Sequence, residues 1–213
     1  MPYMQPAMNN YFGFQPVRAD GGIIQCNPYL VSSSEASAIS IGDVVCQTSI
    51  GTVRVITGAY TATSSMATVG VAGSHVPANG GSTAALLTAV SSQVCLVYDR
   101  PDQLFAVCDT TSGVVGPQTG LFKNYRILAT GCVGSTGVNS SLNRSVMAIS
   151  GVTATADGAF KPMYLHPVES GLFSSAAAAA TATAAGVRKF IGQFVNQITQ
   201  QSSALNAIQN TTS

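Results

Sequence analysis

The middle of the chain, from about residue 23 to 170, is a succession of short apolar runs separated by Gly, Pro, Asp or Ser. The runs are rich in Val, Ile, Tyr, Phe and Thr, a composition typical of β-strands. Within one of them Arg54 stands between Val53 and Val55, the alternation of a strand with one buried face. Many short strands predict an all-β fold, jelly-roll-like or a small β-barrel or sandwich. The runs cover residues 22–33, 42–49, 51–58, 66–73, 92–99, 104–110 and 161–168.

The first 22 residues follow neither the helical nor the alternating pattern, and prolines at positions 2, 6 and 16 prevent a regular helix. Two interpretations stay open: a chain end lying over its own core, or an extended arm that docks on a neighbouring molecule. The candidate interaction residues are the large apolar side chains of this segment, namely Tyr3, Met4, Met8, Tyr11, Phe12 and Phe14.

The last stretch, residues 171–213, begins with an Ala-rich, low-complexity run at 174–186. The following residues allow a helix, because several apolar side chains fall on one helical face, or a compact strand. Gly192 would cost a helix about 1 kcal/mol, which favours a strand over 187–195. The predicted organisation is therefore an arm (1–22), a β-barrel or sandwich body (23–170), and an Ala-rich linker with a C-terminal strand or helix (171–213).

Charged residues make up only 8% of the chain, against about 25% in ordinary soluble domains, and the formal net charge is +1. A free monomer usually stays soluble through a charged surface. This composition therefore predicts a surface that copies of the chain, or neighbours in an assembly, cover. The basic residues are scattered, with Arg188 and Lys189 the only adjacent pair, so no direct contact with nucleic acid is expected. No apolar stretch reaches the length of a membrane span, and the N-terminus lacks the pattern of a secretory signal.

The five cysteines are far apart and form no Cys-x-x-Cys pair. Three of them lie in apolar runs, where a thiol behaves as a small core side chain. We therefore expect free thiols and no zinc site, since only His75 and His166 could add imidazole ligands.

The most structured motif is VYDRPDQLFAV at 97–107, in which two apolar runs flank a polar turn. Asp99, Pro101 and Asp102 are typical turn residues, so we assign them a structural role. The alternative is a cation site formed by Asp99 with Asp102 and Asp109. Calcium loops usually have more oxygen ligands and a Gly, which favours the turn.

No pattern in the chain predicts catalysis or a cofactor. Ser74 and His75 are adjacent in sequence, and neighbours on a strand point to opposite faces. No nucleophile elbow, phosphate-binding loop or dinucleotide-binding fingerprint occurs. We therefore expect a protein that is not an enzyme.

The order of features in roughly residues 1–170 resembles that of tailed-bacteriophage head decoration proteins, also called cement or auxiliary capsid proteins. The resemblance rests on four segments in this order: GDVV (42–45), VGVA (69–72), a loop of small residues, and CLVYDRPDQLFAV (95–107). The resemblance implies a barrel or jelly-roll-like body on the exterior of a virion capsid. Its expected partners are the major capsid protein and copies of the chain, with synthesis in the host cytoplasm and no catalytic residues.

The alternative function is a phage tail, baseplate or surface receptor-binding module. Such a module would normally carry exposed aromatic side chains on the loops of its β scaffold. The chain has no Trp, and its Tyr and Phe residues concentrate in the N-terminal segment and the expected strands, which favours the decoration protein.

Overall fold

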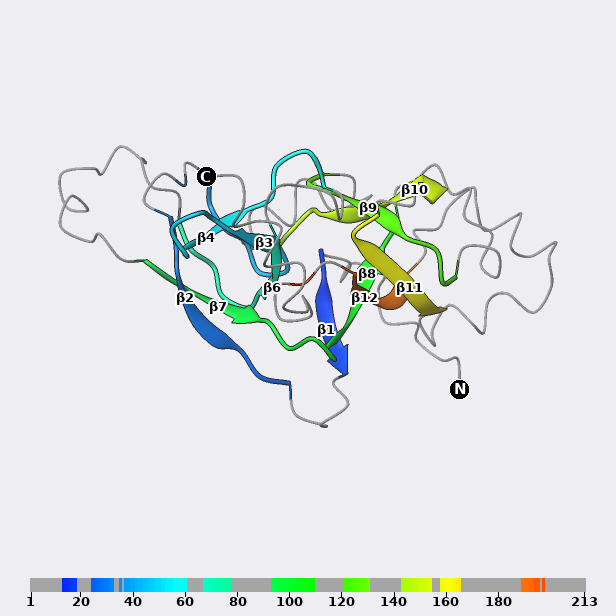
Figure 1. The fold of residues 1–213 in the computed structure, drawn as a ribbon, viewed down its shortest axis with the longest axis horizontal. Coiled ribbons are helices and arrows are strands. Elements are labelled where there is room, and N and C mark those ends of the chain that lie inside the picture. Colours follow the sequence, from blue (N-terminus) through cyan, green and yellow to red (C-terminus); the bar gives the residue numbers. More distant parts are fainter. Residues whose placement is uncertain are drawn as a thin grey trace, which may run out of the picture.

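The structure is a computed structural model. It describes residues 13–18, 24–32, 35, 37–60, 67–77, 93–109, 121–130, 143–154, 158–165, 189–195 and 197. All regular elements of these residues are strands, arranged in two antiparallel sheets (Figure 1). The predicted all-β class is confirmed, and the two sheets are consistent with a β-sandwich. The described part of the chain contains no helix that could cross a membrane.

The smaller sheet has five strands in the order β2-β7-β6-β3-β4. A single parallel bridge between Val31, directly after β2, and Val53 on β4 links the two outer strands at one point. The strands are β2 (Asn27–Leu30), β7 (Val94–Tyr98), β6 (Thr68–Ala72), β3 (Val44–Gln47) and β4 (Val53–Val55).

The larger sheet has seven strands, six of them in the order β1-β8-β12-β11-β9-β10, while β5 pairs with β9. A second parallel bridge, between Asp109 and Ile149, links the end of β8 to β10. The strands are β1 (Gln15–Arg18), β8 (Leu104–Cys108), β12 (Lys189–Phe194), β11 (Phe160–Leu165), β9 (Tyr125–Leu128), β10 (Ala148–Ala154) and β5 (Ala59–Tyr60).

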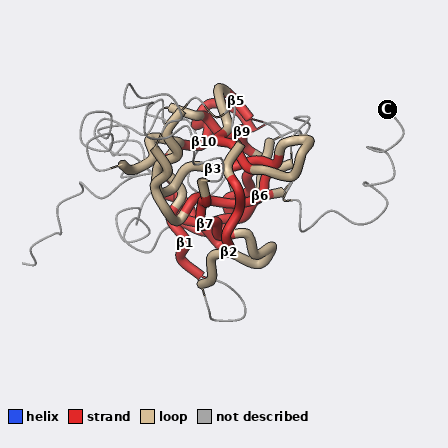
Figure 2. Tube along the Cα trace, turned by 90° about the vertical axis from the view of Figure 1, so that its left-hand side faces the viewer, coloured by secondary structure: helices blue, strands red, loops and turns tan. Residues whose placement is uncertain are grey.

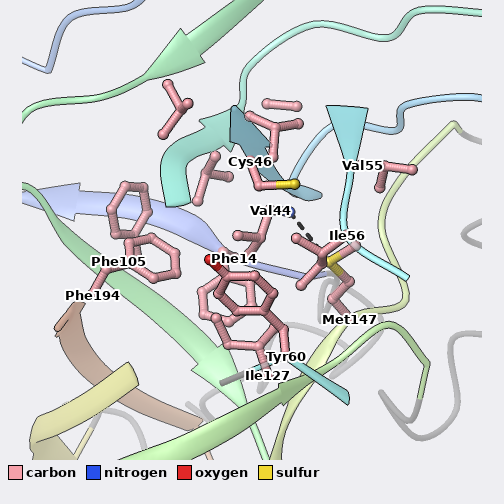
Figure 3. Packing of buried hydrophobic residues seen from close by; sticks show 14 of the residues in the cluster. Phe14, Val44, Cys46, Val55, Ile56, Tyr60, Phe105, Ile127, Met147 and Phe194 are labelled. Atoms are coloured by element: carbon pink, nitrogen blue, oxygen red, sulfur yellow. Dashed lines mark hydrogen bonds between the residues drawn. The ribbon is translucent and has the colours of Figure 1, made fainter. Parts of the chain in front are cut away.

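One hydrophobic core contains residues of both sheets. The end-on view shows the strands of the two sheets gathered together (Figure 2). The smaller sheet contributes mainly Val side chains and the larger sheet aromatic rings. Phe194 is the centre of the aromatic cluster, with ring centroids 5.2 Å from Phe105 and 5.4 Å from Phe14 (Figure 3). Its ring centroid is also 5.6 Å from that of Phe160. The amide of Val44 donates to Met147 Sδ at 3.2 Å across this core.

Each of the seven apolar runs contains a strand. The sequence favoured a strand over a helix for residues 187–195, and β12 confirms this. Close packing of β12 on β11 requires a glycine at position 192, because a Cβ there would collide with the backbone of Lys161 and Pro162. Strands β1, β5, β9 and β10 were not predicted. The body is also wider than residues 23–170, since β1 and β12 both pair with β8.

Phe14 does not belong to an arm that docks on a neighbouring molecule. Its side chain is fully buried in the core between Phe160 and Phe194, so it cannot reach a neighbouring molecule. For this residue the interpretation as a chain end packed on its own core holds, because an aromatic ring gains most by filling the space between the sheets. The other candidates, Tyr3, Met4, Met8, Tyr11 and Phe12, lie outside the described residues, as does most of 171–213.

Candidate interaction surface

Strand β7 has an apolar outer face. Its sequence, VCLVY, is apolar throughout, yet its side chains alternate between exposure and burial. Cys95 and Val97 are fully buried, whereas Val94 is 48% exposed and Leu96 42% exposed. The outward positions of a strand with one solvated face are normally polar. The core therefore does not explain why Val94 and Leu96 are apolar.

Strand β2 extends this apolar surface. In the antiparallel register Leu30 lies opposite Val94 and Pro28 opposite Leu96. Because the Val31 amide donates to the Gln93 carbonyl, both pairs are non-hydrogen-bonded pairs, in which side chains approach most closely. Pro28 and Leu30 are both exposed. We call Pro28, Leu30, Val94 and Leu96 together the β2–β7 apolar face.

Asp99 fixes β2 in place. Asn27 Nδ2 donates to both carboxylate oxygens of Asp99, at 2.9 and 3.0 Å, and the Tyr29 hydroxyl donates to Oδ2 at 2.6 Å. Burial, together with this bond to the Asp99 carboxylate, raises the pKa of Tyr29 to about 12. The Asp99 carboxylate thus attaches the edge strand β2 to the end of β7.

A β-turn that contains Pro101 and Asp102 follows β7, and Asp99 lies just before it. The Gln103 amide donates to the Arg100 carbonyl at 3.1 Å, which places Pro101 at the second position of a β-turn. The Arg100 guanidinium donates to both carboxylate oxygens of Asp102, at 3.0 and 2.8 Å. Asp99 and Asp102 therefore face different partners. Among the described residues no group of three His, Cys, Asp or Glu is arranged to hold a metal ion.

Buried carboxylates hold loops to the sheets, a role that the sequence did not predict. Glu35 accepts hydrogen bonds from the amides of Ser37, at 3.1 Å, and Val55, at 2.9 Å. Asp43 accepts from the Ser40 amide at 2.7 Å, and burial raises its pKa. No pattern signals such residues, because each partner is a backbone amide that the fold brings close.

Ser74 forms a hydrogen bond with the backbone of β7 beside the β2–β7 apolar face. Its Oγ accepts a hydrogen bond from the Leu96 amide at 2.9 Å. This bond fixes the loop after β6 against β7. The arrangement gives Ser74 a structural role at the point where Leu96 faces outward.

The four described cysteines are free thiols, as expected, and Cys132 lies outside the described residues. Cys46, Cys95 and Cys108 are buried, and Cys26 is half-buried. Burial raises the pKa of Cys46 and that of Cys95 to about 11. Both thiols are thus protonated at neutral pH and act as small core side chains.

Comparisons with known proteins add no relative. No protein-family model matches the chain, and searches of curated proteins and of solved structures gave no match.

Proposed function

We propose that the chain is a virion structural protein that decorates the exterior of an icosahedral phage capsid and stabilises it. Its partners are the major capsid protein and its own copies. The observation that carries the proposal is the β2–β7 apolar face, four exposed apolar side chains in register on a chain with 8% charged residues. Such a face supports a protein contact with few charges to desolvate.

The energetics suit a contact that is repeated many times. Covering a half-exposed aliphatic side chain gains about 1 kcal/mol, so one β2–β7 apolar face gains about 3–4 kcal/mol. This is a weak contact for one molecule. On a lattice with copies contacting each other, however, linked weak contacts act together and give firm attachment.

Pro28 decides how the contact is made. In a non-hydrogen-bonded pair the backbone N–H points away from the partner strand, so the N–H that Pro28 lacks would face the open edge of β2. A strand from another molecule would lose a hydrogen bond there. The proposed contact therefore uses the apolar side chains of β2 and β7 rather than an added strand.

The double variant Leu30→Ser/Leu96→Ser tests the proposal on heads of the virus that carries this gene. We expect the variant to fold and to leave heads undecorated, and these heads to lose their genome at lower temperature than decorated ones. Ile50→Ser is the matched control, because Ile50 is 75% exposed in the turn between β3 and β4. Full occupancy by the double variant would refute the role of this face. Decorated and bare heads of equal heat resistance would refute stabilisation.

One observation favours the second candidate function, a surface receptor-binding module. Phe122, in the turn before β9, is 64% exposed. The sequence did not reveal this loop aromatic, because nothing in LFKNYRIL distinguishes an exposed Phe from a core one.

A further inference from the structure

Two exposed aromatic residues belong to segments that the backbone joins at the larger sheet. Phe122 is 64% exposed and Tyr164, on β11, is 53% exposed. The Phe122 amide donates to the Pro162 carbonyl at 2.7 Å, which attaches the turn to β11 two residues before Tyr164. A β-bulge between Pro162 and Tyr164 changes the direction of the strand face there, so that Pro162 is buried and Tyr164 exposed.

The backbone at Phe122 is strained. Its φ is 63°, in the left-handed region that a bulky side chain rarely adopts. Such a conformation is energetically unfavourable, and it persists where the surroundings or a function require it. A ring that is mostly exposed to solvent gains little from the core in return. Folding alone therefore does not explain an aromatic side chain at this position.

Basic residues lie on the same segments as the two rings. Lys123 is exposed next to Phe122 before β9, Arg126 is exposed on β9, and Lys161 is half-exposed on β11. The pair Phe160–Tyr125 joins β11 to β9, and both residues are buried, so their neighbours Lys161 and Arg126 lie on the outer face. None of the described acidic residues belongs to β9, β11 or β12. We call Phe122, Lys123, Arg126, Lys161 and Tyr164 the basic–aromatic face.

Side-chain amides complete this outer surface. Gln193 on β12 lies opposite Lys161, and Asn124 precedes β9; both are half-buried. An amide offers a hydrogen-bond donor and an acceptor, whereas Lys and Arg only donate. The surface thus combines planar apolar rings, positive charges, and groups that both donate and accept.

From this combination we infer that the basic–aromatic face binds an acidic polysaccharide. The rings of Phe122 and Tyr164 cover the C–H faces of sugar rings, while Lys123 and Lys161 bind the carboxylate, sulfate or phosphate groups. The side-chain amides of Asn124 and Gln193 form hydrogen bonds with the sugar hydroxyls. A DNA strand has no free hydroxyls along its chain for these amides to bind, so it fits less well and serves as a comparison in the test.

The two surfaces lie at opposite ends of the molecule. Figure 1 shows β2 and β7 towards one end of the long axis, and β9 and β11 towards the other. A partner on the β2–β7 apolar face would leave the basic–aromatic face accessible. The inference goes beyond the proposed function and does not require it, since the isolated chain should bind.

The test measures binding of the full chain to a fluorescent galacturonic acid decamer, with a neutral maltose oligomer and the single strand dT20 as comparisons. We expect Kd for the acidic decamer to be at least about tenfold lower than for either comparison, which is a difference of about 1.4 kcal/mol. Added salt should weaken binding of the acidic decamer.

Paired variants locate the site. Lys123→Gln/Lys161→Gln should raise Kd for the acidic decamer about tenfold or more, from loss of two charge-assisted contacts. Phe122→Asn/Tyr164→Ser should raise it about fivefold; Asn tolerates the positive φ, so the turn is kept. The controls Arg54→Gln, on β4, and Ile50→Ser should leave Kd within about twofold, as expected of distant independent sites. Unchanged unfolding temperatures confirm that all variants fold.

Three results would overturn the inference: no binding of the decamer at millimolar concentration, dT20 bound as tightly as the decamer, or a Kd that neither pair of variants changes. The first would show that the face does not take acidic sugars of this kind. The second would show a general site for polyanions. The third would place binding elsewhere. None of these results bears on capsid decoration, which the variants of β2 and β7 test separately.

Discussion

Strands β6 and β7 are neighbours in one sheet and read alike in sequence, as TVGVA and VCLVY, but they meet different surroundings. All five residues of β6 are buried, because protein covers both of its faces. On β7 the two residues Val94 and Leu96 are exposed and alternate with the buried Cys95 and Val97, while Tyr98 is half-buried. A run of apolar residues therefore indicates either two buried faces or one buried face and one interface. The second case applies to β7 if a partner covers Val94 and Leu96.

The largest expected effect is on folding, and it separates the two strands. Val71→Asn on β6 should lower the free energy of unfolding by more than about 3 kcal/mol, because a polar amide replaces a fully buried side chain. The matched change Leu96→Asn on β7 should lower it by less than about 1 kcal/mol, since that side chain already faces water. Urea unfolding of the isolated chain measures both. Equal losses would mean that β7 is as enclosed as β6.

Thiol chemistry sharpens the comparison to adjacent residues of one strand. Burial raises the pKa of Cys95 to about 11 from 9.0, so its thiolate fraction at pH 8 should be about a hundredfold below that of an ordinary thiol. In the variant Leu96→Cys the new thiol should react with iodoacetamide at least about a hundredfold faster than Cys95. Mass spectrometry of the peptide containing both positions gives the two rates, and denaturant should abolish the difference. Similar rates in the native protein would contradict the alternation of β7.

Asp99→Ala should have a smaller effect, a loss of about 1–3 kcal/mol in the free energy of unfolding. The variant leaves the Asn27 amide and the Tyr29 hydroxyl without the carboxylate that accepts from them. The Tyr29 pKa should also fall from about 12 towards 10.0, which ultraviolet titration of the phenol measures. A Tyr29 pKa that stays near 12 would show that burial alone raises it.

The smallest effect is expected at the turn. Replacing Asp102 by Asn removes the ion pair with Arg100. The Arg100 side chain is 33% exposed and the Asp102 side chain 25% exposed. Partly exposed ion pairs contribute about 0.5 kcal/mol, so thermal unfolding should barely change. Added calcium should not stabilise the protein. A calcium-dependent rise in unfolding temperature that the variant lacks would instead support a cation site at this turn.

The sequence predicted the fold class and most strands because apolar runs bounded by Gly, Pro and Asp report local burial. It missed β9, because the alternation in the four residues YRIL is too short to stand out. It also missed β1, a strand of four residues that contains Pro16 and follows a segment with two further prolines. It listed Phe14 among the candidate interaction residues and left open whether the segment packs on its own core, because nothing local distinguishes an aromatic ring in the core from one that reaches a neighbour. Burial of that kind depends on contacts between distant segments, here β11 and β12.

The candidate surfaces were less predictable than the strands. Lys123, Arg126 and Lys161 are scattered in sequence, and only the pairing of β11 with β9 brings them onto one face. Likewise, the role of Asp99 depends on Asn27 and Tyr29, some seventy residues away in the chain. The expectation from composition, a surface that neighbours cover, could be stated from the sequence. The candidate for that surface on β2 and β7 could be recognised only from the register between the two strands.

The most direct test of the central claim, that a partner covers the β2–β7 apolar face, is the reactivity of a thiol placed on it. Leu96→Cys protein is labelled with iodoacetamide free in solution and bound to heads, with Ile50→Cys as the control. The account predicts that head binding lowers the labelling rate at position 96 at least about tenfold, as expected for a buried interface, and leaves the rate at position 50 within about twofold. An unchanged rate at position 96 on fully decorated heads would contradict the account.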